Sequence, residues 1–142
     1  MDIRQLTPRY SVSPQIAVED VAEIAAAGFT TVICNRPDEE VPPSHQAAAI
    51  AAAAEAAGLT FKVLPITHQS MTPQTVATQS AIVTESNGPV LAYCASGTRC
   101  SVIWALAAAS EMSVDHVLET TRRAGYALDN LRPTLDAIAQ NR

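Results

Sequence analysis

Cys94 and Arg99 are separated by four residues and lie between two apolar segments, in the stretch Val90-Leu-Ala-Tyr-Cys-Ala-Ser-Gly-Thr-Arg-Cys-Ser-Val-Ile-Trp-Ala-Leu106. We interpret this stretch as a buried strand, a short loop and an apolar helix. A loop that curls at a helix N-terminus points its backbone N–H groups inward, where the helix dipole also favours negative charge. Such a ring binds an oxyanion and lowers the pKa of a thiol in its mouth. The stretch therefore predicts a nucleophilic thiolate beside a bound anion.

Each position of this loop suits one chemical task. Cys94 would be the nucleophile that forms a covalent intermediate, and Arg99 would hold the anion with two parallel N–H donors. Gly97 allows a positive φ and a close approach of the backbone to the anion. Ser101 is a candidate hydrogen-bond donor to the thiolate or to a leaving sulfur. Backbone N–H groups for the anion are expected from Ala95, Ser96, Gly97 and Thr98.

The rest of the chain alternates strand and helix patterns. Expected strands are Ile3–Leu6, Tyr10–Val12, Phe29–Cys34, Leu59–Pro65 and Val90–Tyr93. The first expected helices are Val18–Ala27, an Ala-rich helix that is capped by Ser44 and ends at Gly58, and one from Thr72 to about Ser86. Three more are expected after them: one from the cysteine loop to Glu111, one from Ser113 to before Gly125, and Arg132–Gln140. This βαβ alternation predicts a single α/β domain over residues 1–142, with a mostly parallel central sheet flanked by helices.

In such a sheet, ligands bind beyond the carboxyl ends of the strands. Cys94 follows one expected strand, the segment 34–36 ends another, and the segment 65–68 follows a third. We therefore expect these three segments to line one pocket.

Composition limits the partners of this domain. The chain has 142 residues, a net charge of -5 and no basic run, which argues against nucleic acid and anionic lipid as partners. No apolar stretch is long enough for a membrane span, and Met1 to Leu6 do not resemble an export signal. Three cysteines in such a chain favour reduced thiols and a cytoplasmic location. No metal-ligand spacing and no Gly-rich nucleotide loop occurs, so we expect neither a metal nor a cofactor.

The segments Asn35–Glu40 and Tyr93–Arg99 together resemble the bacterial β-lactamase-hydrolase-like family, in its phosphatase-like domain. The resemblance extends from about Leu6 to Leu118. It implies the fold of dual-specificity (protein tyrosine) phosphatases and cysteine-dependent hydrolysis of a small anionic phosphate ester. It also implies association with a metallo-β-lactamase-fold protein of sulfide and persulfide metabolism, and hence a second chemistry, rhodanese-type transfer of sulfane sulfur to Cys94.

The chain departs from the phosphatase pattern of His-Cys, five residues, Arg and then Ser or Thr. Tyr93 precedes the cysteine, four residues separate Cys94 from Arg99, and Cys100 follows the arginine. Rhodaneses use loops of this shorter length, so a sulfurtransferase from a thiosulfate or persulfide donor stays open beside the phosphatase-like hydrolase. A third alternative is a non-catalytic anion-binding module, which the intact pair of Cys94 and Arg99 argues against.

Phosphate-ester hydrolysis also needs a general acid for the leaving oxygen. The segment 65–71, where phosphatases of this fold place an Asp, contains no carboxylate. His68 could serve there, and Asp38 after the neighbouring strand is the better candidate. Arg36 would add a second positive charge at the mouth, and Asn35 would brace the cysteine loop.

Two further thiols and two acidic residues complete the candidates. Cys34 and Cys100 could each form a disulfide with Cys94, and our hypothesis is a Cys34–Cys94 redox pair that protects the thiolate from irreversible oxidation. Glu39 and Glu40 are expected to lie in solvent. The Ala-rich helix leaves a homo-oligomer open without deciding it.

Overall fold

Five strands form one sheet in the order β1-β2-β5-β3-β4. A computed structural model describes all residues 1–142. The strands are β1 (Arg4–Thr7), β2 (Tyr10–Ser13), β3 (Thr31–Cys34), β4 (Thr60–Val63) and β5 (Val90–Tyr93). Only β1 runs antiparallel to its neighbour, and the other three pairs are parallel. The predicted α/β fold with a mostly parallel sheet is confirmed.

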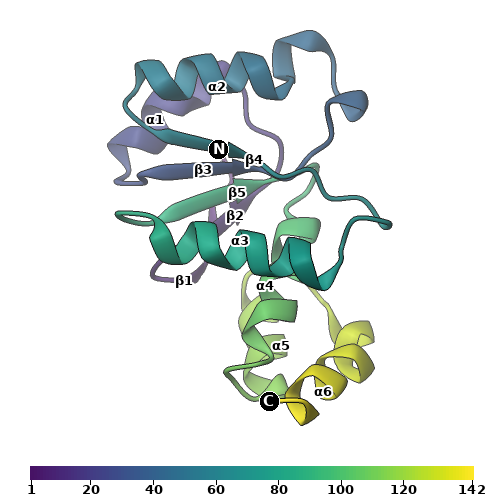
Figure 1. Ribbon diagram of the computed structural model, residues 1–142. Coiled ribbons are helices and arrows are strands. Elements are labelled where there is room, and N and C mark those ends of the chain that lie inside the picture. The colour runs from purple at the N-terminus through teal and green to yellow at the C-terminus, as the bar shows by residue number, and fades with distance from the viewer.

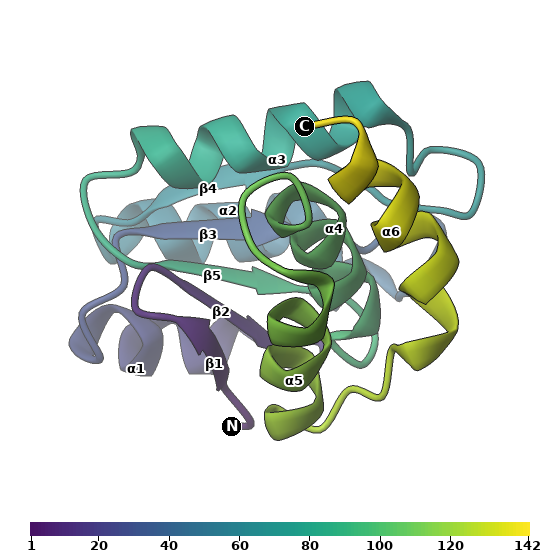
Figure 2. The same ribbon diagram turned by 90° about the horizontal axis from the view of Figure 1, so that it is seen from below.

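Six α-helices cover the sheet in layers. They are α1 (Val21–Ala26), α2 (Ala47–Ala56), α3 (Pro73–Glu85), α4 (Thr98–Ala108), α5 (Val114–Arg123) and α6 (Arg132–Gln140). Helices α1 and α2 cover one face, α3 and α4 lie on the other, and α5 and α6 pack beyond α4 (Figures 1 and 2). None of the helices combines the length and the apolar character that crossing a bilayer would require.

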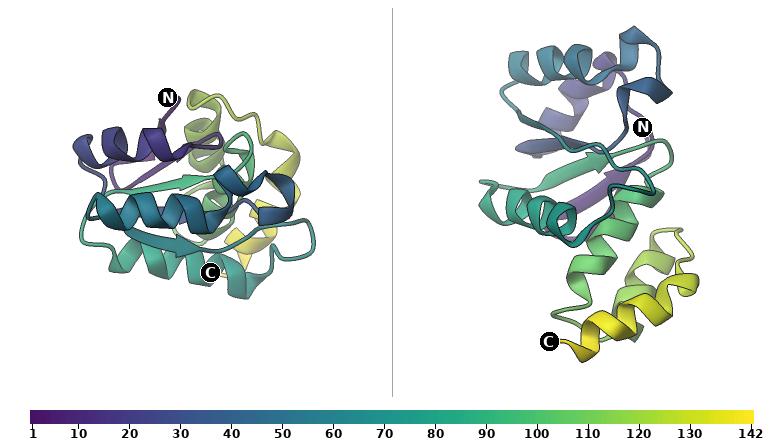
Figure 3. Two further views of the ribbon diagram at one scale, coloured as in Figure 1. Left: turned by 90° about the horizontal axis from the view of Figure 1, so that it is seen from above. Right: turned by 45° about the vertical axis from the view of Figure 1, so that its right-hand side comes forward.

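Two apolar cores fill the space on either side of the sheet. Alternation along β5 divides its residues between them: Leu91 and Tyr93 pack with α1 and α2, whereas Val90 and Ala92 pack with α4, α5 and α6. Cys94 continues this alternation and belongs to the second core. Two views from other sides show the sheet enclosed between these helical layers (Figure 3). Which face a residue takes therefore decides which neighbours it can meet.

The parallel strands end together at one edge of the sheet. Tyr93 of β5 pairs with Ser13 of β2 and with Cys34 of β3, and Cys34 pairs with Val63 of β4. The segments that follow these strands, residues 35–46, 64–72 and 94–97, consequently meet at this edge. The three segments therefore meet at the carboxyl edge of the sheet, where ligands bind in parallel α/β folds. The expectation that all three line one pocket is not met, because the cavity at this edge is lined by residues within 36–39 and 63–70 and by none of the cysteine loop.

Capping residues in the sequence predicted the starts of α3 and α5 correctly but the start of α2 wrongly. Thr72 and Ser113 cap α3 and α5, since their hydroxyls accept from the N–H groups of Thr75 and His116. Ser44 was expected to cap the Ala-rich helix, and this is wrong. Ser44 lies in a 3₁₀ turn (Pro43–His45), and its hydroxyl is hydrogen-bonded to His45 Nδ1.

Helix α2 begins instead at Ala47, whose N–H donates to the distant carboxylate of Asp38 at 2.8 Å. The expected helix from Val18 is also shorter, because its first turn (Val18–Asp20) is a 3₁₀ helix. The 3₁₀ turns Asp38–Glu40 and Asp129–Leu131 complete the elements.

Candidate active site

The cysteine loop joins the end of β5 to the start of α4. Gly97 has φ +93° and is the N-cap of α4. A Cβ at this position would also collide with the hydroxyl of Tyr126, which donates to Ser96 O at 2.9 Å. Glycine is therefore needed for two independent reasons: the left-handed backbone conformation and the close approach of Tyr126.

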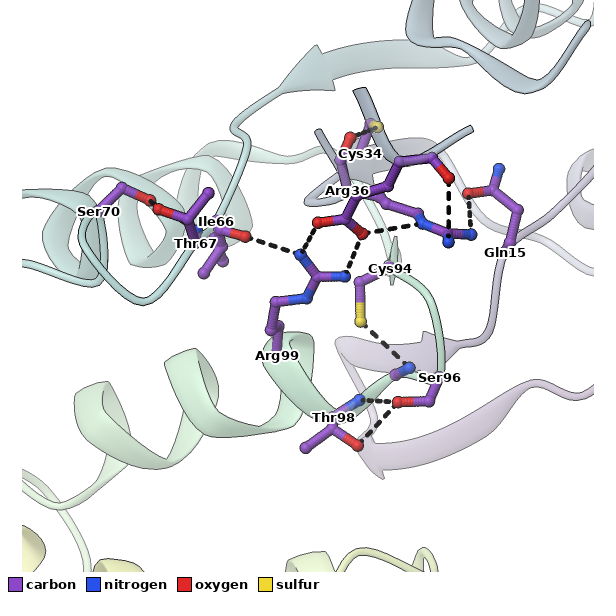
Figure 4. A network of polar contacts seen from close by, with 12 residues as sticks. Gln15, Cys34, Arg36, Ile66, Thr67, Ser70, Cys94, Ser96, Thr98 and Arg99 are labelled. Atoms are coloured by element: carbon purple, nitrogen blue, oxygen red, sulfur yellow. Dashed lines mark hydrogen bonds and ion pairs between the residues drawn. The ribbon is translucent and has the colours of Figure 1, made fainter. Parts of the chain in front are cut away.

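The Cys94 sulfur lies inside the ring of backbone donors. Its Sγ accepts from Gly97 N at 3.1 Å, and Figure 4 shows this contact beneath the Arg99 guanidinium. The Cys100 thiol lowers the pKa of Cys94 most, and the N–H groups of Cys100, Gly97 and Ser96 add to this effect. Burial opposes them, and the resulting pKa is about 5. A thiol with this pKa is ionised at neutral pH and is ready to act as a nucleophile.

Arg99 is held in place by one carboxylate and one carbonyl. Its Nη1 donates to Glu40 Oε2 and to Ile66 O, both at 2.9 Å, and its Nη2 donates to Glu40 Oε1 at 2.7 Å (Figure 4). A guanidinium has five N–H donors. The Nε–H and one Nη2–H have no partner, and they lie on one edge of the guanidinium. This free edge can hold two oxygens of an anion.

Glu40 is the functional residue that sequence reasoning missed. It was expected in solvent, but its carboxylate joins two arginines, because Oε1 also accepts from Arg36 Nε at 3.1 Å. Arg99, and to a lesser degree Arg36, hold the pKa of Glu40 below its ordinary value. The pairing requires a 3₁₀ turn at residues 38–40 and the folded approach of α4. No local pattern predicted either feature.

Asp38 and His68, the two candidate general acids, both lie on segments that follow the strands at the carboxyl edge of the sheet. Asp38 is exposed and lines a cavity of about 260 Å³ with Arg36, Thr67 and Ser70. Its Oδ1 caps α2, as described above. His68 is exposed and does not line this cavity.

Asn35 is fully buried, and it therefore braces the site instead of contacting a ligand. Its Nδ2 donates to Leu64 O and to Gln79 Oε1, both at 2.9 Å, and Gln79 Nε2 donates back to Asn35 Oδ1 at 2.8 Å. Gln79 also donates to the Tyr10 hydroxyl, which donates to Cys100 O at 2.8 Å. The expected brace exists, but it reaches the cysteine loop only through Gln79 and Tyr10, which sequence reasoning did not single out.

Ser101 does not contact the thiolate as expected. Its buried hydroxyl donates to Gly97 O at 2.8 Å and so fixes the shape of the loop. The side chain that lowers the pKa of Cys94 most is that of Cys100, whose own pKa is raised by burial and by the neighbouring Cys94. Ser96 and Thr98 are exposed, and their hydroxyls bond to each other at 2.9 Å. Ala95 is exposed as well.

Cys34 lies on the other face of the sheet from the nucleophile. It packs with Tyr93 in the core beneath α1 and α2, and its thiol donates to Arg36 O at 3.3 Å. Burial raises the pKa of Cys34. All three cysteines are free thiols. Placement on opposite faces argues against the hypothesis of a Cys34–Cys94 pair.

A further cavity, about 600 Å³, is a groove between α3 and α4, and neither Arg99 nor any cysteine lines it. No cluster of three or more His, Cys, Asp or Glu side chains is arranged to hold a metal ion.

The fold and the loop together define a phosphatase-like α/β domain of the dual-specificity type. Residues 2–111 match the family model described as the phosphatase-like domain of the beta-lactamase hydrolase-like protein. The chain belongs to this family.

Curated relatives and solved structures agree with this assignment. The beta-lactamase hydrolase-like protein of Xylella fastidiosa (strain Temecula1) is 31% identical over 106 residues, which are 75% of this chain and 25% of that protein. The same-named protein of Agrobacterium fabrum is 29% identical over 102 residues, 72% of this chain and 24% of that protein. The chain thus covers about a quarter of the length of these relatives.

A crystal structure of a candidate phosphatase from Neisseria meningitidis has a TM-score of 0.86 and 38% identity, covering 97% of this chain and 99% of that one. The active form of Tk-PTP has a TM-score of 0.71 at 18% identity, covering 98% and 97%. Kinase-associated phosphatase, solved with its catalytic cysteine replaced by serine, has a TM-score of 0.64 at 12% identity, covering 90% and 88%. The last two likenesses concern the fold alone.

Proposed function

We propose that this domain hydrolyses phosphate monoesters through a covalent intermediate on Cys94. The observation that carries the proposal is a thiol of pKa about 5, set in a ring of N–H donors below the free edge of Arg99. The Cys94 thiolate attacks phosphorus, the P–O bond to the leaving group breaks, and a cysteinyl phosphate forms. Water then attacks phosphorus, inorganic phosphate leaves, and the thiolate is regenerated.

The charge that develops on the transferred phosphoryl oxygens is met by fixed donors. Arg99 supplies Nε–H and Nη2–H, and the loop supplies backbone N–H groups at the N-terminus of α4. Preorganised donors of this kind are worth several kcal/mol in a transition state. Arg36, which forms an ion pair with Glu40, adds a second positive charge near Arg99.

Asp38 is the proposed acid that protonates the leaving oxygen. Asp38 is exposed and lines the cavity of about 260 Å³ together with Arg36. Its Oδ1 accepts from Ala47 N, whereas its Oδ2 has no hydrogen-bond partner in the protein. A general acid matters most when the leaving group is a poor one. Asp38→Asn should therefore slow alkyl phosphates by roughly 10²-fold or more and aryl phosphates with good leaving groups much less. Equal loss for both substrates would remove Asp38 from this role.

The main experiment follows release of p-nitrophenol from its phosphate ester by wild-type protein and by Cys94→Ser. We expect turnover that is lost by about 10³-fold or more in the variant, because the nucleophile is gone. Rapid acid quench with a ³²P-labelled ester should trap labelled protein only when Cys94 is present. Turnover retained in Cys94→Ser would overturn the proposal, and binding of phosphate without turnover would favour the anion-binding module.

A second candidate is a rhodanese-like sulfurtransferase. The four-residue spacing between Cys94 and Arg99 favours it, as does the absence of a carboxylate in the segment 65–71, since sulfite leaves thiosulfate without a proton donor. Intact mass spectrometry of reduced protein after thiosulfate treatment decides between the two. A gain of one sulfur atom that is absent in Cys94→Ser would establish a persulfide and promote this candidate.

Location and partners follow as proposals from the thiols and the relatives. Three free, buried thiols fit a reducing cytoplasm. The resemblance to the β-lactamase-hydrolase-like family implies a metallo-β-lactamase-fold partner, and we propose such a protein as the partner of this domain.

A further inference from the structure

The proposed function does not use the groove between α3 and α4. This groove has a volume of about 600 Å³, and 10 of its 18 lining residues are hydrophobic. Among them, Val83, Trp104 and Met112 are only partly buried and leave apolar surface open to solvent. Pockets of this volume with mostly apolar walls are typical of sites for small molecules. The groove therefore offers a place for the apolar part of a ligand.

The bottom of the groove is preformed by buried side chains. Tyr10 and Gln79 line it, and they are only 2% and 3% exposed. The Gln79 amide donates to the Tyr10 hydroxyl at 3.1 Å and to Asn35 Oδ1 at 2.8 Å, and the Tyr10 hydroxyl donates to Cys100 O. A buried polar network with every member paired is rigid. The bottom of the groove therefore needs no hydrogen bond from a ligand.

Hydroxyl groups on the walls of the groove are also paired within the protein. Thr84 Oγ1 donates to Ser80 O at 3.0 Å, and Ser110 Oγ donates to Ala107 O at 2.8 Å. Both hydroxyl protons are thus held by backbone carbonyls of the adjacent helices, as is common for Ser and Thr near helices. The polar atoms left for a ligand are mainly those of the two charged side chains that line the groove.

Arg9 presents a fixed and unpaired positive charge to the groove. It lies in the turn between β1 and β2, and its Nη2 donates to Val83 O and Ser86 O, both at 2.7 Å. Its Nε–H and Nη1–H groups have no partner, and Arg9 takes part in none of the ion pairs of the domain. Its free donors can therefore bind an anionic oxygen through charge-assisted hydrogen bonds. The second charged side chain, Glu111, is exposed and has no side-chain hydrogen bond.

We propose that this groove binds one free aliphatic carboxylate, a fatty acid of medium chain length, with its head group on Arg9 and its chain against Trp104. The apolar walls select the chain, because burial removes its surface from water. Glu111 repels a second negative charge, so a head group with a single charge fits better than a phosphate or a dicarboxylate. The inference goes beyond the proposed function and does not depend on it, since no cysteine lines the groove.

Fluorescence of Trp104 tests the site directly, because it is the single tryptophan of the chain and lines the groove. Titration with decanoate, below its micelle-forming concentration, should give a saturable change in Trp104 emission and raise the melting temperature. Decyltrimethylammonium has the same chain with a positive head group and should bind at least roughly tenfold more weakly. The absence of a saturable change with decanoate would overturn the proposal. Equal affinity for both head groups would also overturn it, since the groove would then be an unselective apolar surface.

Variants at the head-group and chain positions locate the ligand. Arg9→Gln should weaken decanoate binding roughly tenfold, whereas Glu111→Gln should bind decanoate at least as tightly as wild type. Ala107→Phe fills the groove and should abolish binding. Ala52→Phe, the same change at an exposed position of α2, is the matched control and should bind decanoate normally.

Unchanged affinity in Arg9→Gln would overturn the position of the head group, and unchanged affinity in a folded Ala107→Phe would overturn the position of the chain. Thermal melting checks that each variant folds, and Arg9→Gln changes an exposed side chain, so it tests the proposal even where Ala107→Phe unfolds. All readouts are fluorescence and melting. A protein without phosphatase activity therefore still tests this inference.

Discussion

The floor and the rim of the site are built by different forces. We call floor the buried group Cys94, Gly97, Cys100, Ser101 and Tyr126, whose contacts are hydrogen bonds inside the core. We call rim the segments 36–40 and 64–71, whose main contacts to Arg99 are a partly exposed ion pair and one carbonyl. Buried, fully paired polar groups are costly to disturb, whereas exposed pairs are not. The floor therefore sets reactivity, and the rim can change with the substrate.

The largest expected effect comes from Arg99, which joins floor and rim. Arg99→Lys keeps the charge but loses the two-pronged edge that is free for the anion. We expect kcat/KM for an aryl phosphate to fall by roughly 10²- to 10³-fold. Steady-state kinetics measures this loss, and thermal melting checks the fold. A fall in kcat/KM of less than about tenfold would mean that the loop N–H groups bind the anion without help from Arg99.

Gly97→Ala should damage the floor specifically. The new Cβ needs the left-handed conformation and meets the Tyr126 hydroxyl. We expect a loss of about 1–3 kcal/mol in the free energy of unfolding together with a clear fall in turnover. Gly58→Ala is the matched control, because Gly58 has φ +81° and a Cβ there would meet nothing within 4 Å. Denaturant unfolding of both variants isolates the cost of the Tyr126 contact, and equal costs would contradict it.

Cys100 gives a pH-dependent test of the floor. The Cys100 thiol is the largest cause of the low pKa of Cys94, which is about 5. The acidic limb of the pH–activity profile, where the thiolate becomes protonated and activity is lost, should therefore lie near pH 5. Cys100→Ala removes the side-chain donor, so the limb should move up by roughly one pH unit. Cys100→Ser restores a donor and should move it back. Cys94 alkylation by iodoacetamide as a function of pH measures the shift, and identical profiles for the two variants would disprove the cause.

The smallest effect is expected at the rim. Glu40→Gln removes the negative charge that lies beside Arg99 and Arg36, so the carboxylate no longer repels a phosphate ester bound at the free edge of Arg99. We expect KM to fall by about two- to fivefold with little change in kcat, as suits an exposed pair worth less than about 1 kcal/mol. The acidic limb of Cys94 should stay in place. A large fall in kcat would instead show that Glu40 holds Arg99 in its working orientation. Glu40 would then belong with the residues that set the reactivity of the site.

Local patterns predicted the elements that carry the nucleophile. The apolar run before Cys94, the glycine at 97 and the apolar run after Arg99 indicate strand, tight loop and helix without any reference to the rest of the chain. The alternation of strands and helices likewise predicts a mostly parallel sheet, whose carboxyl edge gathers the loops. Each of these inferences depends on backbone preferences that act over a few residues.

Long-range neighbours were decided by the tertiary structure. The sequence by itself determined a cysteine loop at a helix N-terminus in an α/β domain. Only the folded chain brought Glu40 onto Arg99, linked Asn35 through Gln79 and Tyr10 to Cys100, and placed Cys94 and Cys100 in one core and Cys34 in the other. The physical reason is that strand register and helix packing assign each side chain to one face of the sheet. That assignment depends on contacts between residues far apart in the sequence.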